Sequence, residues 1–240
     1  MTKDFIYHKL KDNLEQDLCP ICTLINKNID KFIEGLLYES VNDIKIREDI
    51  KKSKGYCNYH AWKLQSFGDP LAHAIIYGDL ISSFGDSIEG FLRHTEGINN
   101  EKKVLFNRSK ENTKVEKFRE NFNTTDICPI CKMVSESEEL YVSAFAESLR
   151  DDNEFKAQFE KSGFLCIPHI IKLIENCGDI NTIREIMEAQ LIKIRKLSHH
   201  LSEIKRKSDY RFSHEEISSE EKTAWIKAVR QWVGEPGIQK

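Results

Sequence analysis

The sequence has little proline or glycine, no long apolar run and no large excess of charge of either sign. Five prolines and 11 glycines in 240 residues exclude collagen-like and Pro/Gly-rich disordered chains. No stretch approaches about 18 consecutive apolar residues, so we expect no membrane-spanning helix. Lys and Arg number 36 against 39 Asp and Glu, a formal net charge of −3. We therefore expect neither nucleic acid nor an anionic membrane as a partner.

The first residues also lack the pattern of an export signal. The stretch MTKDFIYHKLKDNL carries charges throughout and has no apolar core. We therefore expect a cytoplasmic protein in a reducing compartment. In that setting the seven cysteines are expected to bind metal or to take part in redox chemistry, because structural disulfides are rare there.

The chain does contain one cysteine pattern in two copies. A CPIC segment at 19–22 is followed by a CxxH segment at 57–60, and a second CPIC at 128–131 is followed by a second CxxH at 166–169. Each of the four Cys or His positions recurs 109 residues later (19 and 128, 22 and 131, 57 and 166, 60 and 169). Such self-similarity at a fixed offset indicates a duplicated structural unit.

Each copy supplies a complete set of ligands for one zinc ion. Three thiolates and one imidazole complete a tetrahedral shell, and a site with four protein ligands is closed and structural, whereas a catalytic zinc keeps a position open. We therefore predict two zinc ions per chain and no catalytic residue. The predicted ligands of the first ion are Cys19, Cys22, Cys57 and His60, and those of the second are Cys128, Cys131, Cys166 and His169.

Two other functions remain open at this point. The first is a redox protein, because cysteine with some histidine also holds iron–sulfur clusters, and CxxC pairs occur in thiol-based redox proteins. The second is an enzyme with a pocket between the two copies, to which His73, His94 or the segment Asp209–Arg211 would contribute. No phosphate-binding loop, GxSxG or HExxH motif supports an enzyme.

The remaining patterns predict an all-α fold of two tandem helical repeats, each pinned by its own Cys3His site, followed by a C-terminal helix. Pro20 and Pro129 suit the first position of a helix, and long helices are expected from Pro70 and from Ile180, where apolar residues recur at i+3 and i+4. The predicted boundaries are 1–98 for the first repeat, 99–125 for a linker or connecting helix, 126–207 for the second repeat, and 208–240 for a DYRF segment and a docking helix.

The C-terminal helix carries two signals of its own. Ser218 and Glu221 have the spacing of a capping box. Downstream, a helical stripe is expected to dock on the core of the protein itself, with a partner-binding face as the alternative. The stripe consists of Ala224, Trp225, Ala228, Val229 and Trp232.

The motifs together resemble an uncharacterised prokaryotic family of cytosolic proteins of about this length. The resemblance rests on CPIC…GYCNYHAWKLQSFGDPLAHAIIYGDLI, on CPIC…SGFLCIPHIIKL and on the closing DYRFS…EEK…W, and it extends from about Lys9 to Gly234. It implies a helical fold and metal binding at the eight matching Cys and His residues, and it brings no activity. We expect a binding module or scaffold with a protein partner; a small-molecule ligand is the alternative.

Overall fold

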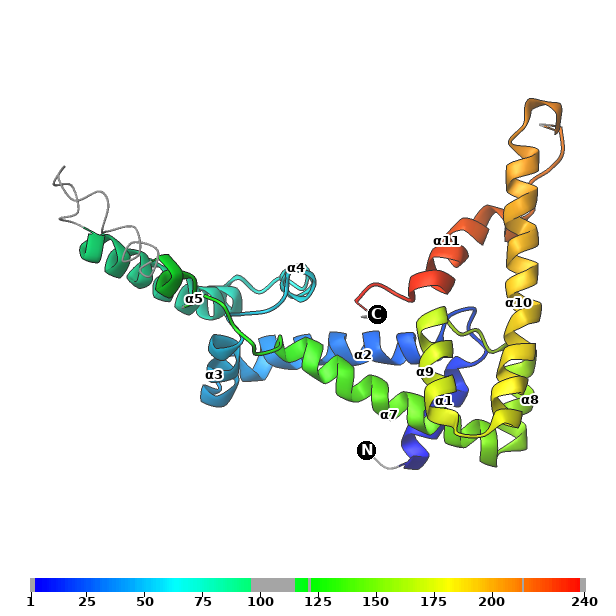
Figure 1. Cartoon of the computed structure of the whole chain (residues 1–240), viewed down its shortest axis with the longest axis horizontal. Coiled ribbons are helices and arrows are strands. Elements are labelled where there is room, and N and C mark those ends of the chain that lie inside the picture. Colours follow the sequence, from blue (N-terminus) through cyan, green and yellow to red (C-terminus); the bar gives the residue numbers. More distant parts are fainter. Residues whose placement is uncertain (1–2, 96–114, 121, 213, 238–240) are drawn as a thin grey trace, which may run out of the picture. The chain divides into compact units, whose positions relative to one another are not determined.

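The structure is a computed structural model, and it describes residues 3–95, 115–120, 122–212 and 214–237. Within these ranges the regular elements are all helical and no strand occurs, which confirms the all-α prediction. Figure 1 shows them in chain order. The helices are α1 (Lys3–Asn13), α2 (Pro20–Gly35), η1 (Leu36–Ser40), α3 (Ile44–Lys52), α4 (Asn58–Ser66), α5 (Pro70–Thr95), α7 (Pro129–Asp151), α8 (Asn153–Ser162), α9 (Ile167–Cys177), α10 (Ile180–Lys207), η2 (Tyr210–Phe212) and α11 (Ser219–Val233), with a further helical turn over 115–120.

The helices begin where the local sequence signals place them. α2 and α7 start at Pro20 and Pro129, and the two long helices α5 and α10 start at Pro70 and Ile180. The Asp179 carboxylate accepts a hydrogen bond from the Thr182 N–H at 2.8 Å and so caps α10. A side chain that accepts from a free N–H of the first turn stabilises a helix by about 1 kcal/mol. Helix starts were therefore predictable because the capping residues are local.

The chain divides into two compact units, whose boundaries differ from the predicted repeats. The first unit comprises residues 1–28 and 134–240, and the second comprises residues 29–133. Each unit thus contains the CPIC segment of one repeat and the CxxH segment of the other. The division passes through α2 and through α7, which both contribute residues to each unit.

The core of the first unit is aromatic and aliphatic. Phe145 on α7 packs edge-on against Phe155 and Phe159 of α8, with ring centroids 5.1 and 5.5 Å apart. These rings are buried, and so is Tyr141, whose hydroxyl accepts a hydrogen bond from the Asn28 amide at 2.7 Å. That bond joins α2 to α7 and satisfies a buried polar group, as a close-packed interior requires.

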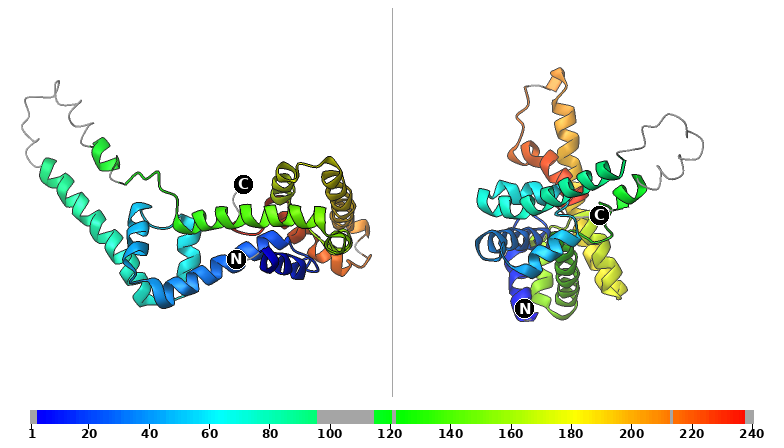
Figure 2. Two further views of the ribbon diagram at one scale, coloured as in Figure 1. Left: turned by 90° about the horizontal axis from the view of Figure 1, so that it is seen from below. Right: turned by 90° about the vertical axis from the view of Figure 1, so that its left-hand side faces the viewer.

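The C-terminal helix docks by a different face from the predicted one. After α10 the chain turns back, and α11 packs on α10 and α9 (Figures 1 and 2). Ala224 and Gln231 are buried there, whereas Trp225 and Trp232 are 62% and 66% exposed. The prediction that the tryptophan stripe docks on the core is therefore wrong. Ala224 allows a closer helix approach than an indole would, and Gln231 donates a hydrogen bond to the Leu165 carbonyl at 2.8 Å.

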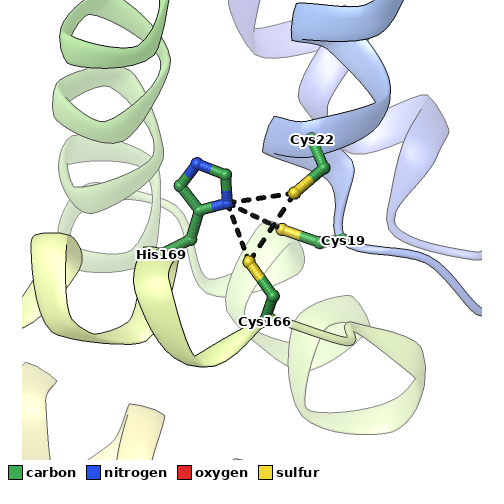
Figure 3. A group of neighbouring side chains, drawn as sticks. All are labelled: Cys19, Cys22, Cys166 and His169. Carbon is green, nitrogen blue, oxygen red and sulfur yellow. Dashed lines mark hydrogen bonds between the residues drawn. The ribbon is translucent and has the colours of Figure 1, made fainter. Parts of the chain in front are cut away.

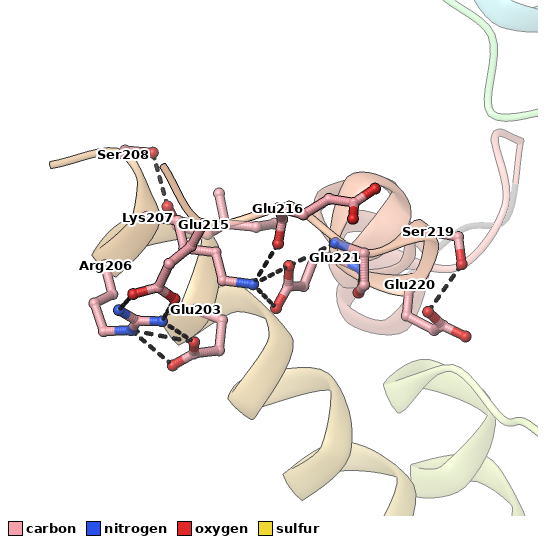
Figure 4. A network of polar contacts seen from close by, with 11 residues as sticks. Glu203, Arg206, Lys207, Ser208, Glu215, Glu216, Ser219, Glu220 and Glu221 are labelled. Carbon is pink, nitrogen blue, oxygen red and sulfur yellow. Dashed lines mark hydrogen bonds and ion pairs between the residues drawn. The ribbon is translucent and has the colours of Figure 1, made fainter. Parts of the chain in front are cut away.

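Ion pairs hold the turn between α10 and α11. Lys207 lies within 2.8 Å of the Glu221 carboxylate, and both side chains are almost buried. Figure 4 shows this pair beside Arg206, which binds Glu203 and Glu215. Ser218 and Glu221 form the predicted capping box at the start of α11. The buried Lys207–Glu221 pair thus connects the end of one helix to the first turn of the next.

The second unit carries an aromatic cluster beside α5. Phe84 contacts Phe122 edge-on at a centroid distance of 4.6 Å, and Phe118 lies 5.3 Å from Phe91. Arg47 and Lys51 of α3 both pair with Asp79 of α5.

Most of the predicted linker 99–125 lies outside the described residues; its described part includes the helical turn over 115–120. In the described chain, no helix is both long enough and apolar enough to cross a bilayer.

Candidate metal centres

The eight predicted Cys and His ligands gather in two clusters, but the pairing differs from the predicted one. In each cluster the four ligand atoms lie within 4.8 Å of one another. The prediction that each repeat completes its own site is wrong, because the CxxC of one repeat meets the CxxH of the other. Centre A consists of Cys19, Cys22, Cys166 and His169, and centre B consists of Cys57, His60, Cys128 and Cys131.

Centre A is a buried, compact set of three sulfurs and one ring nitrogen (Figure 3). The Nδ1 atom of His169 lies 3.3 Å from the Sγ atoms of Cys19 and Cys22 and 3.1 Å from that of Cys166. The Sγ atoms of Cys22 and Cys166 are 3.6 Å apart. A tetrahedral zinc with Zn–S bonds of about 2.3 Å and Zn–N of about 2.0–2.1 Å would separate its ligands by about 3.5–3.8 Å. The cluster therefore fits a single ion.

His169 is oriented by a carboxylate behind it. Its Nε2–H donates a hydrogen bond to Glu138 at 2.9 Å, and Glu138 also pairs with Lys172. Because a carboxylate only accepts, this bond places the hydrogen on Nε2 and leaves the Nδ1 lone pair facing the three sulfurs. Burial opposes ionisation of Glu138, but His169 and Lys172 outweigh it and lower its pKa. Carboxylate–histidine–metal arrangements of this kind are typical of zinc sites.

Centre B has similar ligand distances and a different surrounding. The Nδ1 atom of His60 lies 3.2 Å from the Sγ of Cys57, 3.3 Å from that of Cys131 and 3.7 Å from that of Cys128. Cys57 is partly exposed. Within the described residues the buried Nε2 of His60 has no hydrogen-bond partner. Burial, with a smaller effect of Lys63, lowers the pKa of His60 to about 4, so the imidazole is neutral and able to bind metal near pH 7.

One position of the repeat explains why His169 has a carboxylate partner and His60 has none among the described residues. The residue 109 positions before Glu138 is Ile29, which is fully buried and has no polar side chain. The first repeat therefore lacks an equivalent of the carboxylate that holds His169. Lys172 likewise corresponds to Lys63, which pairs instead with Asp30 at 2.8 Å. Centre A thus has a polar support that the sequence does not supply for centre B.

The three neighbouring thiols of centre A shift one another's pKa values in opposite directions. Without a bound metal, burial opposes the Cys19 thiolate, yet hydrogen bonds from Cys166 and Cys22, and the proton that His169 takes up beside that thiolate, lower the pKa of Cys19 well below its ordinary value. A metal ion would replace this proton on Nδ1. The same thiol contacts raise the pKa of Cys22. A second or third thiolate therefore needs a cation among the sulfurs. This is the electrostatic behaviour expected of a thiolate metal site, where the dication deprotonates the coordinating thiols.

Helix starts and a braced loop position the ligands. Cys57 and Cys166 are the N-cap residues of α4 and α9, and neither sulfur accepts a capping hydrogen bond, so both remain available to a metal. The positive end of a helix dipole favours thiolate at this position. The loop before Cys166 is braced by Gln190, which accepts from the Leu165 N–H at 3.1 Å and donates to the Gly163 carbonyl at 3.2 Å.

Sequence reasoning did not find the residues that support the ligands. Glu138, Gln190 and Gln231 are buried polar residues, and in the sequence they look like ordinary helix residues. The only available signal was a polar side chain at an apolar position of the helical pattern. Cys177, the seventh cysteine, is buried outside both clusters.

The residues considered for an enzyme have local contacts in the described part of the chain. His73 hydrogen-bonds the Asp69 carbonyl of its own helix start through Nδ1 at 2.8 Å and stacks on Tyr77. Asp209 pairs with Arg211, while Tyr210 between them is 85% exposed. His94 lies in α5, and its side chain is outside the described part. None of these contacts forms an acid–base pair or a nucleophile–base pair.

The fold and the two centres define an all-helical protein with paired Cys3His clusters formed across a duplicated motif. The chain belongs to a family of unknown function, DUF6062, whose model matches residues 1–235, which confirms the resemblance seen in the motifs. A relative, the uncharacterized 23.9 kDa protein in the xynA 3′ region of Caldicellulosiruptor sp. (strain Rt8B.4), is 36% identical over 218 residues, covering 91% of this chain and 96% of the relative. No solved structure matches.

Proposed function

We propose that the protein binds two zinc ions, one at each centre, and acts as a cytoplasmic binding module or scaffold. The observation that carries the proposal is the closed ligand set: each centre offers four ligands within 4.8 Å of one another. A tetrahedral ion with four protein ligands has no position left for water or substrate. The zinc ions are therefore assigned a structural role, with no chemistry at the metal.

Zinc suits these centres better than an iron–sulfur cluster does. The Sγ atoms of Cys131 and Cys57 in centre B lie 3.6 Å apart, as do those of Cys22 and Cys166 in centre A. One tetrahedral ion spans that separation, whereas a cluster places several irons and sulfides between its thiolates and holds them further apart. A single iron ion with the same ligands is distinguished from zinc by elemental analysis.

The proposed zinc ions would connect distant parts of the chain. At centre A, one ion joins the N-terminal CPIC segment to the CxxH segment that starts α9, 144 residues later. Closing so long a loop in the unfolded chain is entropically costly, and a metal that binds only the folded chain contributes its binding free energy to stability. We infer that the metal fixes the topology of the helices, which suits a scaffold.

The exposed face of α11 supports a protein partner. Trp225, Val229 and Trp232 lie at i, i+4 and i+7 and are 62%, 59% and 66% exposed. Tryptophan is enriched at the centres of protein interfaces because it buries a large area at a low entropic cost. A stripe of this kind, on a helix anchored by its opposite face, would present a rigid surface to a partner.

Elemental analysis of the purified protein tests the zinc assignment. We expect about two zinc ions per chain and a colourless protein, with about one zinc lost in Cys22→Ser and one in Cys131→Ser. The exposed Ser135→Ala on α7 is a matched control that should keep both ions. Iron with a visible absorption band would support the redox function instead. Two metals retained in both cysteine variants would overturn the ligand assignment.

A further inference from the structure

The first unit contains a basic cavity apart from the metal ligands. It has a volume of about 260 Å³ and is lined by residues of α8, α10 and α11, of the segment before α2 and of the loop between α8 and α9. Four of the lining residues are Lys161, Lys193, Lys196 and Lys227, and the lining acids are Asp17 and Glu220. The cavity therefore carries an excess of two positive charges in a protein whose net charge is −3. Concave walls with an excess of one sign concentrate the field and attract counter-ions.

Only part of this positive charge is neutralised within the protein. Lys227 pairs with Asp17, which accounts for one lysine. In the described chain neither Lys161 nor Lys196 forms an ion pair with a carboxylate within 4.0 Å. Glu220 opposes one more lysine charge, since Lys196 lowers the pKa of the Glu220 carboxyl group. The excess of two positive charges is available to an anion from solution.

Lys193 is built into the wall of the cavity. It is half-buried, and its ammonium donates hydrogen bonds to the carbonyls of Phe159, at 3.0 Å, and Gly163. Burial lowers its pKa, and a weaker attraction to Glu160 opposes this effect; its hydrogen-bond partners are carbonyl groups, which do not neutralise the charge. An ammonium has three N–H donors, and these two bonds use two of them. The ring of Phe159 also lies 5.3 Å from the ammonium, and the third donor is the one that a ligand in the cavity would use.

A buried histidine nitrogen in the same cavity has no partner. His200 lines the cavity, and its Nε2 is buried without a hydrogen-bond partner within the described residues. His200 follows Lys193 and Lys196 on α10 at spacings that place all three on one helix face. Buried polar atoms are nearly always hydrogen-bonded in native proteins, so an unpaired one in a cavity points to a missing partner such as a ligand atom.

We propose that this cavity binds a phosphate group, either free or carried by a small molecule. Lysine ammoniums bind phosphate as point charges, and Lys193, Lys196 and Lys161 would supply them, with His200 as a further hydrogen-bond partner. Phe164 and Leu197 line the same cavity and offer an apolar wall to the organic part of a phosphate ester. The volume of about 260 Å³ suits a metabolite smaller than a typical drug-sized ligand.

The site also adjoins the loop that leads to centre A. Gly163, whose carbonyl binds Lys193, and Phe164 of the cavity wall precede the metal ligand Cys166 in one short segment. The proposed site is nevertheless independent of the zinc assignment, because none of its lining residues is a metal ligand. Metal content and phosphate binding can therefore fail separately in an experiment.

Calorimetric titration of the full-length, metal-loaded protein with inorganic phosphate, in chloride buffer, tests the proposal. We expect saturable binding with a Kd below about 5 mM. Lys161→Gln and Lys196→Gln change exposed side chains and should each weaken it about tenfold, the value of one charge-assisted hydrogen bond. Lys205→Gln, which removes the same charge from an exposed position of α10 outside the cavity, should leave it unchanged.

Two further probes identify the source of the phosphate. Phenyl phosphate binding more tightly than inorganic phosphate would indicate an ester whose organic part meets Phe164 and Leu197, and the reverse order would indicate free phosphate. The proposal is overturned if phosphate binding is not saturable below about 5 mM, or if Lys205→Gln weakens it as much as Lys196→Gln does. It is also overturned if a ten-nucleotide single-stranded DNA binds more tightly than both and depends on Lys196, because the surface would then be a nucleic-acid site.

Discussion

The Sγ atoms of Cys22 and Cys166 lie 3.6 Å apart, although 144 residues separate them in the sequence. Cys57 and Cys131 of the other centre have the same Sγ separation, with 74 residues between them. Each centre therefore joins the two copies of the duplicated motif. Neither cluster can therefore be completed from one copy of the motif alone.

Paired double variants distinguish the crossed arrangement from sites within each repeat. Cys22→Ser with Cys166→Ser removes two ligands of centre A and should leave about one metal per chain. Cys22→Ser with Cys57→Ser removes one ligand from each centre and should leave almost none. Elemental analysis after gel filtration measures both, and circular dichroism verifies that each variant remains helical. The opposite order of metal contents would show that each repeat holds its own ion.

The carboxylate behind His169 should set the affinity of centre A. Glu138→Ala removes the group that accepts from His169 Nε2 and leaves a buried donor unpaired. Loss of such a partner typically lowers metal affinity by about 10–100-fold. Competition with a chromogenic chelator measures this loss for one of the two ions. Glu139→Ala, at the adjacent exposed position, is the control, and equal affinities in the two variants would contradict the role of Glu138.

The two centres should release metal at different rates. In centre B, Cys57 is partly exposed and His60 has no described hydrogen-bond partner on Nε2, whereas centre A is buried and supported. A chelator should therefore remove one ion at least about tenfold faster than the other, because the Glu138 hydrogen bond to His169 and the exclusion of solvent both slow ligand exchange at centre A. The fast phase should be missing in Cys57→Ser. If the slow phase is missing instead, centre B releases its metal more slowly than centre A, contrary to the prediction.

Several helices of the fold were readable from the sequence because the signals that start them are local. Pro20 and Pro129 begin helices wherever the rest of the chain lies, and Ser218 with Glu221 caps α11 through neighbouring atoms. The ligand residues were also recognisable from their spacing. The sequence did not reveal which CxxC segment lies beside which CxxH segment. The two copies have identical spacing, so either pairing agrees equally well with the offset of 109 residues.

A local sequence pattern also does not determine which face of a helix is buried. The stripe on α11 contains both Ala224 and Trp225, and hydrophobicity alone favoured the tryptophan as the buried residue. The structure buries Ala224 because a small side chain lets α11 approach α10 and α9, and it leaves Trp225 exposed. Glu138 was missed for a related reason: its role depends on His169, 31 residues further along the chain.

The Lys207–Glu221 pair should make part of the free energy of unfolding of the first unit depend on pH. This part should be lost in acid, and mutation of Glu221 can isolate it. Lys207, followed by the Ser218 N–H, lowers the pKa of Glu221. A carboxyl group with a lowered folded pKa stabilises the protein above its unfolded pKa of about 4.3, and this stability is lost as the pH falls through the folded value. Glu221→Gln keeps an oxygen acceptor for the Ser218 N–H but removes the charge. Its deficit in the free energy of unfolding should therefore be constant above about pH 5 and should shrink at lower pH.

Denaturant unfolding of the wild type and the variant between pH 3 and pH 8 (values set about the carboxyl pKa) measures that deficit. Metal release in acid affects both proteins alike, so it cancels in the difference between them. Glu175→Gln, at an exposed position of α9, removes the same charge from a residue that forms no ion pair with any described residue, and it should show no such pH dependence. A deficit for Glu221→Gln that stays unchanged down to the lowest pH would mean that the pair contributes through packing and the cap alone, because protonation of the wild-type carboxyl would then have no effect.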